Sequence, residues 1–130
     1  MEAFMEKIAG LICEDWPNST ASEQAEKMMK LCTIVEFHHI ENLNARQKIQ
    51  LFNSLSGNWG FTMIVVDSAY HLADDLEELQ WILPEIYYAG LKLCLIHGDQ
   101  LVEVKMEKPN DRILNIGVDL DFDWLAGVSA

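Results

Sequence analysis

Basic residues are scarce in this sequence: nine Lys and Arg stand against twenty-one Asp and Glu, a formal net charge of −12. Nucleic acids and anionic membranes are bound through basic surfaces, so the composition argues against direct binding to either. The same imbalance favours solubility and attracts basic molecules over a long range. We therefore expect a partner that presents a basic protein surface.

Long apolar runs and paired cysteines are also missing. No apolar segment approaches the ~20 residues that span a bilayer, and Glu2 and Glu6 lie where an export signal would be basic. Cys13, Cys32 and Cys94 are odd in number and form no CxxC pair, which is typical of reduced thiols rather than a disulfide framework. These features predict a cytoplasmic protein.

No motif of a catalytic, cofactor or metal site is present. The sequence lacks HExxH, Cys/His zinc spacing and the GxSxG nucleophile elbow. Gly57 and Gly60 precede a predicted strand, whereas the glycines of a phosphate-binding loop precede a helix. We predict no catalytic residue, no cofactor and no metal ion, and we do not expect an enzyme.

The histidines offer a weaker alternative, a small enzyme built on scattered groups. His38 and His39 are neighbours on a predicted helix and would point about 100° apart rather than toward one metal ion. Cys94 and His97 would face opposite sides of a strand. His71 has aspartates nearby in the sequence and could act as a general base. A pocket that gathers His71 or His97 with a shifted pKa would support this alternative.

Half of the 130 residues are hydrophobic, which is enough apolar material for one core. We predict a single domain, residues 1–130, with a helical half (1–57) and a half made of a strand, a helix and a three-stranded meander (58–130).

Three helices are predicted in the first half. An apolar stripe over residues 4–12 has helical spacing. Thr20 with Glu23, and Asn44 with Gln47, are capping boxes, in which each side chain satisfies the other residue's free backbone N–H. The second helix is expected to continue to about residue 35, which places His38 and His39 near its C-terminal end.

The second half changes to strand patterns. Residues 61–66 form a short, β-branched apolar run, and a long helical stripe follows, in which Pro84 should cause a kink or a break. Alternating stretches separated by turns then predict an antiparallel meander at 91–95, 102–106 and 114–120. The predicted fold class is α+β: about three N-terminal helices and one long, Pro-interrupted helix packed on one face of a small, mainly antiparallel sheet of about four strands.

The segment between Lys48 and Lys92 contains no Lys or Arg, and several of its acidic residues lie near a tryptophan. The simple explanation is a solvated helix face, with Asp74 and Glu77 as a further capping pair. The alternative is a docking surface, because an exposed aromatic ring in an acidic field is typical of a binding hot spot. The predicted partner-binding residues here are Asp74, Asp75, Glu77, Glu78, Trp81 and Glu85.

A second acidic segment contains Asp119, Asp121 and Asp123, which would project from one side of a strand. Three explanations stay open: a charged edge that prevents self-association, a partner-binding surface, and a divalent metal site. The similarity to a calcium loop fails at Trp124, which lies where the loop needs Gly.

The leading functional prediction is a small, acidic, non-catalytic binding or inhibitor protein that docks on a basic surface. Such a surface could belong to a nucleic-acid-handling defence complex, which a phage anti-defence inhibitor would block, or to a nuclease toxin with its immunity protein. The alternative is an acidic cytoplasmic adaptor or secretion chaperone that holds a partner segment on an apolar sheet face or helix stripe. The sequence leaves the partner's identity and the oligomeric state open.

Overall fold

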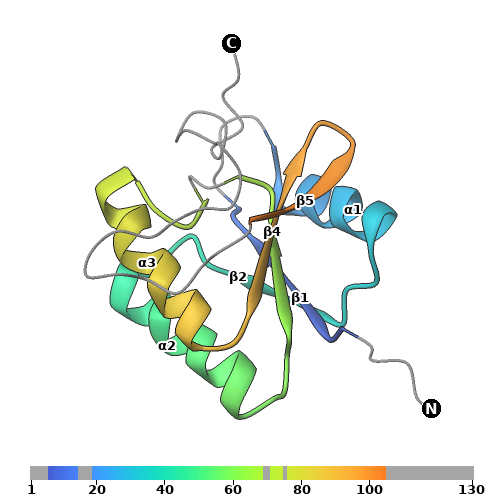
Figure 1. The fold of residues 1–130 in the computed structure, drawn as a ribbon. Helices are drawn as coiled ribbons and strands as arrows, with labels where there is room; N and C mark the ends of the chain where they lie inside the picture. Colours follow the sequence, from blue (N-terminus) through green and yellow to red (C-terminus); the bar gives the residue numbers. More distant parts are fainter. Residues whose placement is uncertain (1–5, 15–18, 69–70, 75, 105–130) are drawn as a thin grey trace, which may run out of the picture.

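In the part of the chain that the computed structural model describes, five strands form one sheet with helices on both faces (Figure 1). The structure describes residues 6–14, 19–68, 71–74 and 76–104. In chain order the elements are β1 (Ile8–Ile12), α1 (Ala21–Leu31), β2 (Glu36–His39), α2 (Ala45–Gly57), β3 (Met63–Val66), α3 (Leu76–Tyr88), β4 (Lys92–His97) and β5 (Gln100–Val104).

The sheet is mostly parallel, with the strand order β2-β1-β3-β4-β5. The first four strands run parallel, and β5 alone runs antiparallel, to β4. The prediction of a mainly antiparallel sheet of about four strands is therefore wrong. The hairpin between β4 and β5 is confirmed: His97 pairs with Gln100, and Gly98 turns the chain with a φ of 64°.

The helices cover both faces of the sheet, not one as predicted. α1 lies on one face, and α2 and α3 lie side by side on the other (Figure 1). β1 contributes side chains to the cores on both faces of the sheet. Ile8 and Ile12 pack in the core under α1, whereas Ala9 and Leu11 pack in the core under α2 and α3. A strand between two helical layers is buried on both sides.

Residues 8–12 form the strand β1 and not the predicted first helix. All five of its residues are buried. A parallel strand of this kind shows no alternation of apolar and polar residues, so its short apolar run fits a helical period equally well. The prediction was wrong because the periodicity of a run this short does not distinguish the two structures.

The second predicted helix also ends earlier than expected. α1 ends at Leu31, and residues 36–39, predicted near the helix end, form the edge strand β2 instead. Both helix starts are confirmed. Thr20 with Glu23 and Asn44 with Gln47 form complete capping boxes at α1 and α2.

α3 continues through Pro84 as a single helix, so of the kink or break predicted at this proline the break does not occur. Leu83 and Ile86 on either side of the proline are both buried in the core, and this packing offsets the lost backbone hydrogen bond. The predicted strand at residues 61–66 is confirmed as β3, and it pairs with β4 in parallel. The predicted strand at 114–120 lies outside the described residues. Within the described ranges, no helix is long and apolar enough to cross a bilayer.

Candidate functional site

The carboxyl ends of the parallel strands meet at one edge of the sheet, the upper edge in Figure 1. A pocket of about 380 Å³ opens there, on the face that carries α2 and α3. Its walls come from the residues after three strands, Cys13 after β1, Glu41 after β2 and His71 after β3, together with Lys48 of α2. The parallel topology thus collects residues that are far apart in the sequence.

A side-chain amide holds the β1 end of the pocket in place. Gln24 of α1 is fully buried, and its Oε1 accepts a hydrogen bond of 2.8 Å from the backbone N–H of Cys13. The Nε2 of Gln24 donates to the backbone oxygen of Cys13 at 2.7 Å. Cys13, the first residue after β1, is therefore held against α1 by side-chain hydrogen bonds in place of strand pairing.

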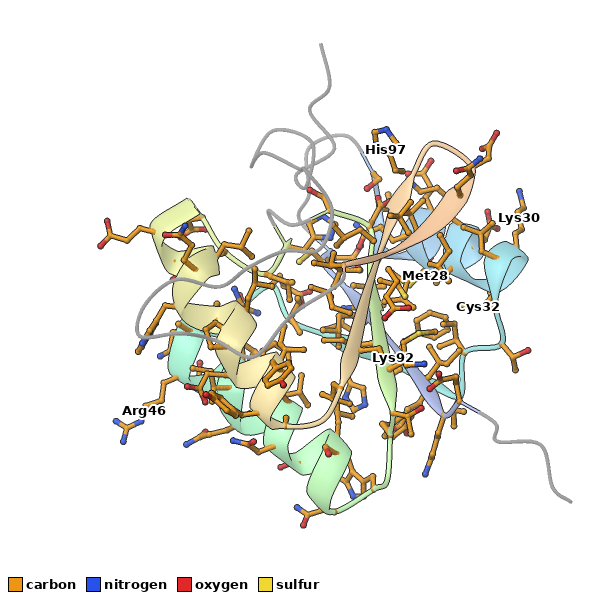
Figure 2. All side chains as sticks on the ribbon, viewed as in Figure 1. Met28, Lys30, Cys32, Arg46, Lys92 and His97 are labelled. Carbon is orange, nitrogen blue, oxygen red and sulfur yellow. The ribbon has the colours of Figure 1, made fainter. Side chains whose placement is uncertain are left out.

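Lys48 is a buried lysine at the first turn of α2. The residue is only 8% exposed, and its Nζ donates a hydrogen bond of 2.9 Å to the backbone oxygen of Leu72. Lys48 makes no ion pair with any carboxylate in the described part of the chain. By contrast, Arg46 two residues earlier is exposed and points away from the body of the protein (Figure 2).

Two ionisable groups of the pocket are held in their neutral forms. Burial is the main cause that lowers the pKa of His71 to about 4, and the nearby Lys48 adds to the effect. Burial, with a smaller effect of Glu41, raises the pKa of Cys13 to about 11. Proton transfer from this thiol to this imidazole is strongly unfavourable, so the two do not form a thiolate nucleophile with its base.

Three acidic residues also line the pocket: Glu41, Asp74 and Glu78. Burial acts to raise the pKa of Glu41, but hydrogen bonds from backbone N–H groups, including that of Glu14 at 3.0 Å, and from His39 outweigh it and lower the pKa. Glu41 is therefore ionised at neutral pH. The lining of the pocket therefore combines the ammonium group of Lys48 with carboxylates.

The side of α3 that faces away from the core carries acidic and aromatic residues together. Trp81 is 59% exposed and Tyr88 is 62% exposed. Glu77 and Glu85 lie one helical turn before and after Trp81, so their side chains flank its ring. The helix contains no basic residue. We call this surface the α3 stripe; it consists of Glu77, Trp81, Glu85 and Tyr88.

The predicted docking residues therefore divide into two groups. Asp74 and Glu78 line the pocket, while Glu77, Trp81 and Glu85 lie on the outer side of α3. The expected capping pair of Asp74 with Glu77 is not formed; the N–H of Asp74 instead donates to Oε1 of Glu78 at 2.7 Å. The remaining predicted residues, Asp75, Asp119, Asp121 and Asp123, lie outside the described residues.

The histidines are distributed over separate places. His38 and His39 lie on β2, where they contact Glu36 at 3.0 Å and Glu41 at 3.3 Å. His97 lies at the β4 end of the hairpin (Figure 2) and does not line the pocket. Only His71 is gathered into the pocket. In the residues that the structure describes, no cluster of three or more His, Cys, Asp or Glu could hold a metal ion.

Sequence reasoning missed the most distinctive pocket residues, Cys13, Glu41 and Lys48. One available signal was the spacing of Lys48 on its helix, because it lies four residues before Phe52 on the stripe that packs into the core. The positions of Cys13 and Glu41 follow from strands that the sequence pattern did not reveal.

No protein-family model matches this chain, and comparisons with curated proteins and with solved structures found no match.

Proposed function

We propose that this protein is a non-catalytic binding or inhibitor protein that docks on a basic surface of a partner protein through the α3 stripe. The observation that carries the proposal is the exposed ring of Trp81, flanked by Glu77 and Glu85 on a helix with no basic residue. Tryptophan is the residue type most enriched in binding hot spots.

The helix that carries the α3 stripe is held firmly against the sheet. Residues on the inner side of α3 pack in the core, among them Leu79, Ile82 and Ile86, each at most 1% exposed. A helix held in this way presents Trp81 and its acidic neighbours with little conformational entropy left to lose on binding. This supports docking as a preformed surface.

The charge of the stripe indicates the kind of partner. Its carboxylates would meet Lys and Arg side chains, and long-range attraction would speed association at low salt. Nucleases and nucleic-acid-binding complexes present such basic surfaces because they neutralise phosphates. A nuclease toxin or a nucleic-acid-handling defence complex is therefore the class of partner we propose.

The arrangement of the helices supports docking through α3 over the adaptor alternative. Helices lie on both faces of the sheet in the described ranges, which counts against a partner segment lying on an open apolar sheet face. It would have to use a helix surface or a strand edge, and binding of that kind would survive high salt.

The experiment compares matched pairs of variants in partner capture followed by affinity measurement. Trp81→Ala is paired with Trp59→Ala, because Trp59 is also exposed, at 47%, but lies between α2 and β3. The double reversal of Glu77→Lys and Glu85→Lys is paired with reversal of Glu26 in α1 and Asp99 in the turn between β4 and β5, which are both exposed and lie outside α3.

The proposal expects the two α3 variants to weaken binding at least about tenfold, while the two controls stay within about twofold. Raising the salt concentration should weaken wild-type binding and should affect the doubly reversed variant much less. If all four variants bind alike, the α3 stripe is not the docking surface. Reversal of Asp119, Asp121 and Asp123 in the same assay tests the second predicted acidic segment.

A further inference from the structure

The pocket at the carboxyl edge of the sheet contains a buried lysine, Lys48, whose hydrogen-bonding capacity the described residues use only in part. The ammonium group of Lys48 has three N–H donors, and the described residues supply it with one neutral acceptor, the backbone oxygen of Leu72. No carboxylate of the described residues pairs with it. Burial of an ammonium group without a direct ion pair is costly, so an anionic group in contact with Lys48 would stabilise this arrangement.

The start of α2 adds to the positive potential at the same wall. The capping box uses the N–H groups of Asn44 and Gln47, and the N–H of Lys48 bonds to the backbone oxygen of Asn44. The first-turn N–H groups of Ala45 and Arg46 therefore have no acceptor within the helix. Ala45 and Lys48 are three residues apart, lie on one face of α2 and both line the pocket.

We propose that this pocket binds a small organic anion, with its carboxylate or phosphate between the Lys48 ammonium and the N-terminus of α2. Lysine and a helix N-terminus are both established ways to hold such groups. This inference goes beyond the proposed docking function and does not depend on it.

The acidic residues of the lining define the rest of the ligand. Glu41, Asp74 and Glu78 supply carboxylate acceptors, so the ligand carries hydroxyl or amino donors besides its one anionic group. The neutral His71 and the side chain of Ile40 add a less polar part to the lining. The volume, about 380 Å³, falls within the range of small-molecule sites.

The position of the pocket agrees with a general property of parallel sheets. Open sheets of this type bind ligands outside the carboxyl ends of the strands, where the strand order reverses. Here the chain passes from β1 to β2 and then returns across β1 to β3, so the reversal lies at the end of β1. Cys13, the residue after β1, lines the pocket.

The test is a nuclear magnetic resonance titration of the full chain with four defined probes. These are glycerol 3-phosphate, L-serine, inorganic phosphate and uncharged glycerol. The first two combine one anionic group with donors, and they distinguish a phosphate ligand from a carboxylate ligand. We expect saturable shifts of the amide signals of Cys13, Ala45 and Lys48 with at least one of these two, and none with glycerol.

Two variants separate the roles of the two positive groups. Lys48→Met keeps the buried aliphatic chain and removes the charge, and it should weaken binding at least about tenfold. Ala45→Pro removes one amide donor at the first helical position, where proline is well tolerated, and it should weaken binding several-fold. Lys30→Met, at an exposed lysine of α1 (Figure 2), is the matched control and should leave binding unchanged.

The outcomes are distinct from those of the docking experiment. Saturable binding that Lys48→Met abolishes and Lys30→Met preserves supports the anion site, whichever of the two probes binds. Failure of both organic probes to give saturable shifts overturns the proposal. Equal binding to the wild type and to Lys48→Met overturns it as well. If Lys48→Met does not fold, unchanged binding to Ala45→Pro is the contradicting result.

Discussion

The side chain of Gln24 hydrogen-bonds to both backbone polar groups of Cys13, as a neighbouring strand would. Oε1 accepts from the N–H at 2.8 Å, and Nε2 donates to the oxygen at 2.7 Å. Both residues are buried. The amide therefore replaces sheet hydrogen bonds at the point where β1 ends and the pocket begins.

Replacement of this amide should destabilise the protein strongly. In Gln24→Leu, the size is nearly kept, but the N–H and C=O of Cys13 are left buried without partners. We expect the free energy of unfolding to fall by about 2–4 kcal/mol, measured by urea denaturation. The control Gln50→Leu changes an exposed glutamine of α2 and should cost less than ~0.5 kcal/mol. Equal effects of the two substitutions would show that the double hydrogen bond contributes little.

Gly10 is required by close packing under α1. A Cβ atom at this position would lie 2.6 Å from Cδ1 of Phe37 and 2.9 Å from Sδ of Met28. Gly10→Ala should lower the free energy of unfolding by about 1–3 kcal/mol, because both side chains must move.

The matched control for Gly10 is Gly57→Ala. A Cβ atom on Gly57, the last residue of α2, meets nothing within 4 Å, so this substitution should be neutral or stabilise by up to ~1 kcal/mol. If Gly10→Ala were as stable as Gly57→Ala, the layer between β1 and α1 would be more loosely packed than the structure shows.

The stability of the protein should fall as the pH is lowered from about 6.5 to 4. His71 has its pKa lowered to about 4, mainly by burial, while the unfolded chain has an ordinary histidine pKa of about 6.5. Between these values the unfolded state binds a proton that the folded state does not, so acid favours unfolding. The slope from this residue is at most about 1.4 kcal/mol per pH unit.

Urea denaturation of wild type and His71→Leu across this pH range measures the contribution. The difference between the two stability curves should change between pH 6.5 and 4 and stay constant above pH 7. Carboxylates such as Glu6, whose pKa is lowered by its hydrogen bond to Lys92, add a further loss at lower pH in both proteins. Parallel curves over the whole range would contradict the burial of a neutral His71.

The three cysteines should differ in reactivity although all are free thiols. Burial raises the pKa of Cys94 to about 12 and that of Cys13 to about 11, whereas Cys32 is only partly buried and its pKa is raised by burial as well. Because only the thiolate reacts, iodoacetamide at pH 8 should label Cys32 first in the native protein.

Mass spectrometry of peptides after timed labelling gives the order. Cys13 and Cys94 should react at rates that approach that of Cys32 only after unfolding in urea, which serves as the internal control. Native labelling of Cys94 as fast as Cys32 would mean that the sheet opens far more readily than its burial implies.

Local signals in the sequence determined the starts of α1 and α2 and the hairpin between β4 and β5. Thr20 with Glu23, and Asn44 with Gln47, each satisfy backbone groups within one turn of helix, so their effect does not depend on distant residues. The turn at Gly98 is equally local. The acidic character of α3 and the position of Trp81 on its outer side were also readable from spacing alone.

The tertiary structure decided the parallel order of the sheet and the existence of the pocket. β1 is buried by helices on both sides, and this removes the alternation by which a strand is recognised. The burial of Lys48 beside Cys13 and His71 depends on strands that are separated by whole helices in the sequence. Contacts of that range arise from packing, and no pattern within a single segment of the chain encodes them.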